Sequence, residues 1–127
     1  MSSILIIEDD SDLAELMAIT LRTVGHEIHH APDGRSALAA LQVSRPDLVL
    51  LDIMLPDIVG FSLCEALRRL TATDRLPILV VSACDEYEAR PLAIAAGANG
   101  FLAKPFEPRQ LLARVRTLLD RATPRAA

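Results

Sequence analysis

The chain has 127 residues, of which 51% are hydrophobic and 24% are charged, and its formal net charge is −4. This length and balance fit one globular domain with its own core. The acidic total and the scattered Lys and Arg residues disfavour a nucleic-acid-binding surface. No apolar run reaches the ~20 residues of a membrane helix, and "MSSILII" lacks the basic start of a signal peptide. Cys64 and Cys84 lack metal-binding spacing, so we expect reduced thiols and a cytoplasmic location.

Strand-like and helix-like patterns alternate along the chain. Short apolar runs predict strands, and apolar residues at helical spacing predict the helices that follow them. The predicted strands are Ser3–Ile7, His26–Ala31, Leu48–Leu51, Pro77–Ala83 and Gly100–Lys104. The predicted helices are Ser11–Gly25, Asp33–Ser44, Gly60–Thr71, a short helix that stops before Gly97, and Glu107–Arg121. Asp10 or Ser11 is expected to cap the first helix.

A proline restricts where the fourth helix can begin. Pro91 lacks the N–H of a helical residue and its ring clashes with the preceding turn, but the first position of a helix tolerates it. We therefore expect this helix to begin near Arg90. The preceding segment, Asp85–Ala89, is predicted to be an extended or irregular loop beside the functional site.

The alternation of strands and helices predicts an α/β fold, an open doubly wound parallel sheet with helices on both faces. Strands without polar alternation are typical of strands that are covered on both sides, whereas "HEIHHA" is more polar and is expected at one edge. Ligands of such sheets bind beyond the carboxyl ends of the strands. The residues that follow the strands are therefore the candidates for function.

Chemically active residues lie at the carboxyl ends of four of the predicted strands. In chain order these are Glu8, Asp9 and Asp10, then Asp52, Ser82 and Lys104. Each has an ordinary alternative, because an acidic residue after a strand often caps a helix, and a serine or lysine can lie in a solvated loop. Four such strand ends at one edge of a sheet are less easily explained in that way.

The chemistry of these residue types fits phosphoryl transfer. Carboxylates that lie close together repel one another, and a hard divalent cation such as Mg²⁺ relieves that repulsion. A carboxylate beside the cation can attack phosphorus and form an aspartyl-phosphate. Such a transfer needs mainly positioning and charge neutralisation. The sequence thus indicates Asp52 as the nucleophile, with Lys104 and either the Ser82 hydroxyl or backbone N–H groups facing the phosphoryl oxygens.

The segments "ILIIEDD", "DLVLLDIMLP", "ILVVSA" and "AAGANGFLAKPF", with the spacings between them, resemble the response-regulator receiver domains of bacterial two-component signalling. The resemblance covers nearly the whole chain and implies five strands in the flavodoxin-like order 2-1-3-4-5. It implies that Asp52 is the phosphoacceptor and that Glu8, Asp9 and Asp52 bind Mg²⁺ or Mn²⁺. The main-chain carbonyl of Met54 matches the remaining protein ligand of the metal.

The same resemblance implies how the site would act as a switch. Ser82 and Lys104 match the residues that hold the phosphoryl group, Phe101 matches the aromatic switch residue, and Lys104–Pro105 matches a bond that is usually cis. After phosphorylation Ser82 would move toward the phosphate and Phe101 would rotate inward. The surface of the fourth helix, fifth strand and fifth helix would then change.

The implied function is a phosphorylation-dependent signalling switch that receives a phosphoryl group from a histidine kinase or a phosphotransfer protein. The chain would be no enzyme beyond weak autophosphatase activity, would bind no nucleic acid or membrane itself, and would signal to an effector protein or a fused effector domain. We assign residues 1–121 to the receiver domain and 122–127 to a C-terminal tail or the start of a linker. The alternative is a degenerate receiver that binds partners independently of phosphate.

Three positions depart from the family pattern. Val59 replaces the usual acidic residue before the third helix, and because valine cannot cap a helix, either Asp57 compensates or the loop is shaped differently. Asn99 and Gly100 stand where members that dimerise through this surface often carry acidic residues, which argues against a charge-paired dimer. The third departure is Pro91, as described above.

Two further groups of residues carry weaker signals. His26, His29 and His30 surround the predicted edge strand, and we expect them to be solvated rather than to bind a metal. Met54 and Cys84 match the positions that flank the path of attacking water in the family. Neither side chain orients water well, so slow autodephosphorylation is expected.

Overall fold

The computed structural model describes residues 2–122, in which five strands alternate with five helices. The strands are β1 (Ser3–Ile7), β2 (Glu27–Ala31), β3 (Leu48–Leu51), β4 (Ile78–Ser82) and β5 (Gly100–Ala103). The helices are α1 (Ser11–Arg22), α2 (Gly34–Val43), α3 (Gly60–Arg69), α4 (Glu86–Ala95) and α5 (Pro108–Arg121). Each coincides with a predicted element, although α4 begins earlier than expected. Most of the predicted tail, 123–127, lies outside the described residues.

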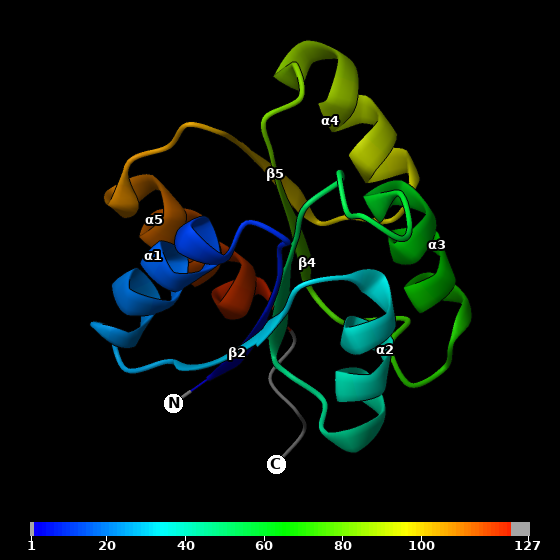
Figure 1. Cartoon of the computed structure of the whole chain (residues 1–127), viewed down its shortest axis with the longest axis horizontal. Helices are drawn as coiled ribbons and strands as arrows, with labels where there is room; N and C mark the ends of the chain where they lie inside the picture. Colours follow the sequence, from blue (N-terminus) through cyan, green and yellow to red (C-terminus); the bar gives the residue numbers. More distant parts are fainter. Residues whose placement is uncertain (1, 123–127) are drawn as a thin grey trace.

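The strands form one parallel sheet in the order β2-β1-β3-β4-β5 (Figure 1). The register pairs Ile7, the last residue of β1, with Leu51, the last residue of β3. Because the strands are parallel, the residues that follow β1 and β3 leave the sheet side by side at one edge. The fold class, the strand order and the edge position of β2 are confirmed.

Helices cover both faces of the sheet, α1 and α5 on one side and α2, α3 and α4 on the other (Figure 1). Successive strand residues serve the two layers alternately. Ile6 and Leu50 pack in the core under α1 and α5, whereas Ile7 and Leu51 pack in the core under the other three helices. This two-sided burial explains why the central strands show no polar alternation.

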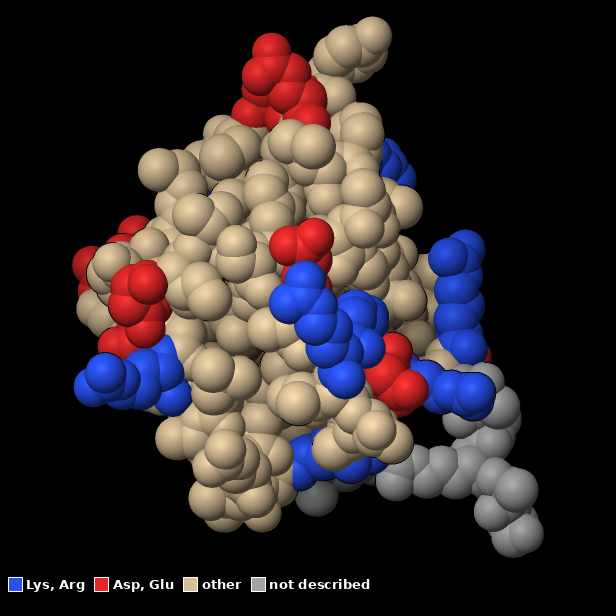
Figure 2. Space-filling view, turned by 90° about the vertical axis from the view of Figure 1, so that its right-hand side faces the viewer, with Lys and Arg blue, Asp and Glu red and all other residues tan. Residues whose placement is uncertain are grey.

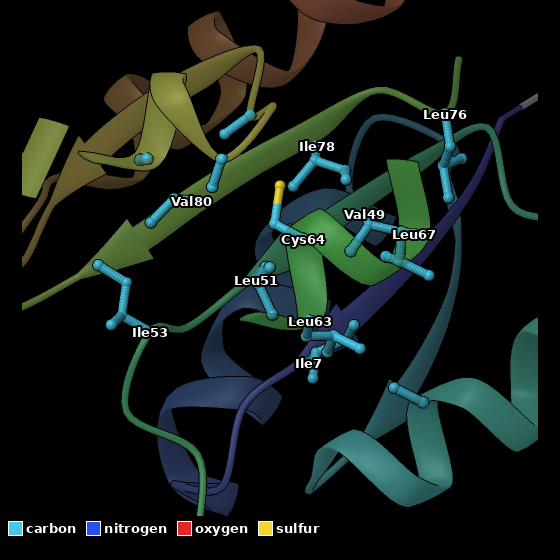
Figure 3. Packing of buried hydrophobic residues seen from close by; sticks show 14 of the residues in the cluster. Ile7, Val49, Leu51, Ile53, Leu63, Cys64, Leu67, Leu76, Ile78 and Val80 are labelled. Carbon is cyan, nitrogen blue, oxygen red and sulfur yellow. The ribbon is translucent and has the colours of Figure 1, made fainter. Parts of the chain in front are cut away.

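The core beneath α3 shows how a helix is fixed to the sheet. Leu63, Cys64 and Leu67 are at most 1% exposed and pack against strand residues that include Val49 and Leu51 (Figure 3). Each fully buried leucine contributes about 1.5–3 kcal/mol by leaving water. Burial raises the pKa of the Cys64 thiol, so this cysteine stays protonated as a core residue. Both cysteines are free, as expected.

The predicted start of α4 is wrong. The helix begins at Glu86 rather than near Arg90, so the segment predicted as a loop is its first turn, and Pro91 lies inside the helix. A proline in a helix loses one N–H and crowds the carbonyl four residues earlier, which here belongs to Tyr87. Tyr87 is 90% exposed, so water can bind that carbonyl.

Several contacts hold the first turn of α4 in place and partly offset the cost of the proline. The Asp85 carboxylate caps α4 by accepting the N–H of Glu88 at 3.2 Å. Glu86 forms an ion pair with Arg90 at 3.0 Å, one turn away, and Ala89 is buried against the sheet. The end of the helix is as predicted, because Gly97 has a φ of 109° and stops it.

The face that α2, α3 and α4 present to solvent consists mostly of uncharged residues, and basic side chains on it lie beside acidic ones (Figure 2). Within residues 2–122, no helix is long and apolar enough to cross a membrane. The tightest group of ionisable side chains lies elsewhere, at the carboxyl edge of the sheet.

Candidate functional site

Three consecutive acidic residues follow β1, and the structure places each one differently. Glu8 is 2% exposed, and its Oε2 accepts the N–H of Asp10 at 3.2 Å. Asp9 is exposed. The Asp10 carboxylate caps α1 by accepting two N–H groups of its first turn, as the sequence predicts. Glu8 and Asp9 are therefore left to face the edge of the sheet.

Asp52 follows β3 and is fixed on both sides. Its N–H donates to the carbonyl of Ile7 at 3.0 Å, which extends the pairing of β1 and β3. On the other side the start of α3 packs against it, and a Cβ on Gly60 would lie 2.5 Å from the Asp52 carbonyl oxygen. Only glycine permits that approach. The Asp52 side chain, in a residue 6% exposed, is thus held rigidly at the end of its strand.

Glu8, Asp9 and Asp52 form one acidic cluster, in which one carboxylate oxygen of each residue lies within 4.8 Å of the others. Oxygen donors of this kind suit Mg²⁺ or Mn²⁺. Burial raises the pKa of Glu8, and the charge of Asp52 adds to that rise, which hydrogen bonding only partly offsets. A cation at the cluster would relieve the repulsion and favour the ionised carboxylates.

Lys104 brings a positive charge to the same cluster. Its Nζ lies 2.6 Å from Glu8 Oε1 and 3.5 Å from Asp52 Oδ2, and its side chain is 16% exposed. Burial alone would lower the pKa of Lys104, but the hydrogen bond to Glu8 and the charge of Asp52 raise it above its ordinary value. Lys104 therefore stays protonated. The Lys104–Pro105 bond is cis, as the resemblance implies.

Ser82 and Phe101 occupy neighbouring strands beside this cluster. Ser82 is fully buried, and its Oγ accepts the N–H of Cys84 at 3.1 Å. Phe101 is also fully buried, and its carbonyl accepts a hydrogen bond from the Arg114 guanidinium. The Phe101 ring lies inward in the core under α4, and its expected rotation after phosphorylation stays a prediction.

The loop between Asp52 and α3 has Val59 in place of the acidic residue that is usual in the family before this helix. Val59 occupies the N-cap position of α3, and no described side chain caps that helix. Asp57 does not compensate, because its carboxylate instead accepts the N–H groups of Gly34 and Arg35 at the start of α2. Of the two alternatives left open by the sequence, compensation by Asp57 is therefore excluded.

Three long-range hydrogen bonds near the strand ends do not follow from the sequence analysis. His30, exposed as expected, places its Nε2 2.7 Å from the main-chain carbonyl oxygen of Glu8. Asn99 Oδ1 accepts hydrogen bonds from Arg68 at 2.8 Å and from the N–H of Ile78 at 2.9 Å, so Asn99 organises the start of β4. Each contact joins residues more than 20 positions apart, and no spacing pattern in one sequence signals such a pairing.

Residues 4–116 match the family described as "Response regulator receiver domain". The DNA-binding dual master transcriptional regulator RpaA of Synechocystis sp. is 39% identical over 121 residues, which cover 95% of this chain and 50% of that protein. The DNA-binding response regulator MtrA of Mycobacterium tuberculosis is 42% identical over 118 residues, which cover 93% of this chain and 50% of that protein. The chain thus spans about half the length of these relatives.

Solved structures of shorter proteins match over almost their whole length. The chemotaxis response regulator CheY4 of Vibrio cholerae superimposes with a TM-score of 0.88 at 32% identity, covering 93% of this chain and 98% of that chain. A two-component response regulator of Clostridium difficile superimposes with a TM-score of 0.90 at 28% identity, covering 98% of this chain and 100% of that chain.

Proposed function

The chain belongs to the response-regulator receiver domains of two-component systems, and from this premise we propose that it is a phosphorylation-dependent switch with Asp52 as the phosphoacceptor. The observation that carries the proposal is the position of Asp52, between two further carboxylates and the ammonium of Lys104. A nucleophilic carboxylate held by a strand end, with a metal-type donor set on one side and a fixed cation on the other, suits in-line attack on phosphorus.

The proposed cofactor is Mg²⁺, with Mn²⁺ as an equivalent ion. Glu8, Asp9, Asp52 and the main-chain carbonyl of Met54 would hold it. When bound, the ion would supply charge neutralisation for the carboxylates and for one phosphoryl oxygen. Glu8 is kept in place for this role by its contacts with Lys104 and with the N–H of Asp10.

The proposed reaction is a transfer from a phosphorylated histidine of a partner kinase or phosphotransfer protein. A carboxylate oxygen of Asp52 attacks the phosphorus, the new O–P bond forms as the P–N bond breaks, and the imidazole leaves with the bonding electron pair. Lys104 exchanges its contact with Asp52 for one with a phosphoryl oxygen. The Ser82 hydroxyl, which now accepts the N–H of Cys84, turns toward another phosphoryl oxygen.

The proposed output is mechanical rather than catalytic. Ser82 and Cys84 connect β4 directly to the start of α4, so a turn of the Ser82 hydroxyl would disturb the first turn of that helix. Beyond weak autophosphatase activity the chain would be no enzyme. It would act in the cytoplasm, bind neither nucleic acid nor membrane itself, and signal to an effector protein or to an effector domain in the same protein.

The test is incubation with acetyl phosphate and Mg²⁺ followed by intact-mass measurement. We expect the mass of one phosphoryl group to appear in the wild-type chain and not in Asp52→Asn. Removal of Mg²⁺ with EDTA should abolish the product. Asp47→Asn is a suitable control, because its carboxylate accepts the N–H of Ser3 at the opposite end of the sheet and should not affect phosphorylation.

Two results would contradict the proposal. A mass increase that persists in Asp52→Asn would place the acceptor elsewhere. The absence of product in a folded wild-type chain, with acetyl phosphate and with a phosphorylated histidine donor alike, would favour the degenerate receiver that binds partners without phosphate.

A further inference from the structure

The loop of residues 53–59, which carries Met54, is attached to a distant helix by one carboxylate. Asp57 Oδ1 accepts the N–H of Gly34 at 2.8 Å, and Asp57 Oδ2 accepts the N–H of Arg35 at 2.9 Å. Both N–H groups belong to the first turn of α2, where no carbonyl of the same helix can accept them. Because both carboxylate oxygens are used, the attachment fixes the direction of the loop as well as its distance from the helix.

The packing at the same point leaves little room for a side chain on Gly34. A Cβ there would overlap Cγ2 of Ile58 and lie 3.3 Å from Oδ1 of Asp57, so these loop side chains would have to shift. An alanine at this position would therefore push the loop away from α2. The position of the loop thus depends on two features, the hydrogen bonds of Asp57 and the small size of Gly34. A substitution can change either feature without removing the other.

The other end of the loop touches the phosphoacceptor. The N–H of Met54 donates to Asp52 Oδ1 at 3.3 Å. Met54 also forms an isolated antiparallel bridge with Val59, and the N–H of Gly60 donates to the carbonyl of Ile53 at 2.7 Å. These bonds close the loop on itself, so a displacement at Asp57 is passed on to Met54.

We propose that Asp57 is a positioning residue for the phosphoacceptor site, because its attachment to α2 holds the main chain of Met54 in place beside Asp52. This inference rests on the proposed function, in which the Met54 carbonyl is a metal ligand. Mg²⁺ requires nearly ideal octahedral geometry at 2.0–2.1 Å from its ligands. A carbonyl shifted by a few tenths of an ångström would therefore bind the ion weakly.

The role of Asp57 can be separated from ordinary helix capping, because α2 has a cap of its own. Asp33 accepts the N–H of Ser36 at 2.8 Å, and within residues 2–122 its carboxylate forms hydrogen bonds only with Ser36 and none with the loop. The two N–H bonds to Asp57 lower the pKa of its carboxyl, so it is ionised at neutral pH. Asp33 and Asp57 therefore act on the same helix end, but only Asp57 connects that end to Met54.

The test compares Asp57→Ala with Asp33→Ala in the full chain by calorimetric titration with Mg²⁺ and by thermal unfolding. We expect both variants to unfold at a similarly lowered temperature. Asp57→Ala should also bind Mg²⁺ roughly tenfold or more weakly, as is typical when a partner that orients a ligand is lost. Asp33→Ala should keep the wild-type affinity.

Two further variants keep the test decisive if Asp57→Ala folds poorly. Asp57→Asn retains one acceptor oxygen and should give an intermediate affinity, and Gly34→Ala should weaken Mg²⁺ binding although the carboxylate is intact. A wild-type affinity in all Asp57 and Gly34 variants, or equal losses in Asp57→Ala and Asp33→Ala, would overturn this inference alone. A wild-type chain that binds no Mg²⁺ would overturn both this inference and the proposed metal site.

Discussion

Lys104 compensates two buried carboxylates, and this compensation can be measured without any phosphoryl donor. We expect Lys104→Met to lower the free energy of unfolding by about 3–5 kcal/mol in EDTA, the usual cost of removing one partner of a buried ion pair. Glu8→Gln should cost much less. The raised pKa of Glu8 means that the fold already disfavours its charged form, and an amide oxygen can still accept from Lys104. Urea denaturation at neutral pH measures both variants.

The control for this comparison is Arg116→Met. This substitution also removes a positive charge. However, the ion pair of Arg116 with Asp120 has an N–O distance of 3.9 Å, and both side chains are largely exposed. Such a pair contributes about 0–1 kcal/mol. Equal losses of unfolding free energy in Lys104→Met and Arg116→Met would show that the buried ion pairs of Lys104 stabilise the fold no more than an exposed ion pair does.

Met54 and Cys84 bear on how long a phosphorylated Asp52 would survive. The Met54 side chain is 66% exposed and Cys84 is partly buried, and neither can hold a water molecule in line with phosphorus. Under the proposed function, a Met54→Asn, Cys84→Glu double variant should lose its phosphoryl group faster than the native chain. The loss of the phosphoryl mass with time after removal of the donor measures the rate. Equal or faster loss in the native chain would refute this prediction.

At the scale of elements, α4 contains a backbone defect that can be repaired. Pro91→Ala restores the N–H that can donate to the Tyr87 carbonyl and removes the clash of the ring, an effect of up to about 3 kcal/mol inside a helix. We expect a higher free energy of unfolding and slower amide hydrogen exchange across Glu86–Ala95. Tyr87→Ala, a change at a 90% exposed position, should stabilise by less than about 0.7 kcal/mol. Unchanged amide hydrogen exchange across this helix in Pro91→Ala would contradict the prediction that Pro91 weakens the helix.

The attachment of the loop to α2 should depend on pH. The pKa of Asp57 is lowered in the folded chain, so its contribution to stability is present above the unfolded value near pH 4 and is lost as pH falls through the folded pKa. The stability difference between the wild type and Asp57→Asn should therefore be constant near neutral pH and shrink below about pH 4. Denaturant titrations at several pH values measure it. A difference that grows on acidification would have the wrong sign.

The elements and the site differ in how far the sequence predicts them. Unbroken apolar runs and helical spacing predict all the strands and helices of the described chain, because burial on one or both faces imposes those periods. The start of α4 differs from the prediction because it depends on Asp85 and Ala89 as well as on Pro91, and these two residues favour an earlier start. The acidic cluster was predicted because its residues share one sheet edge. The contact of Asp57 with α2 could not be predicted, because it depends on the conformation of a loop.

At the scale of the whole molecule, the two core layers meet the site through the strand ends. β1, β3 and β5 each have residues in both layers, and the residues that directly follow them are Glu8, Asp52 and Lys104. The ionisable groups therefore follow strands that are buried on both faces, while loops and helix starts lie around them. Stability of the whole domain should consequently report on what binds at this edge.

Binding of Mg²⁺ to the acidic cluster should stabilise the entire domain, because an ion that binds the folded chain and not the unfolded one shifts the unfolding equilibrium by mass action. At ten times its dissociation constant the ion would add about 1.4 kcal/mol, which raises the unfolding temperature by roughly 5 °C for a domain of this size. We expect Asp9→Asn to lose most of this rise. Asp10→Asn should keep it, because asparagine also caps a helix and Asp10 stands outside the cluster. Thermal unfolding with Mg²⁺, against NaCl of matched ionic strength, measures the rise. An equal rise in both variants would mean that the ion acts elsewhere on the chain.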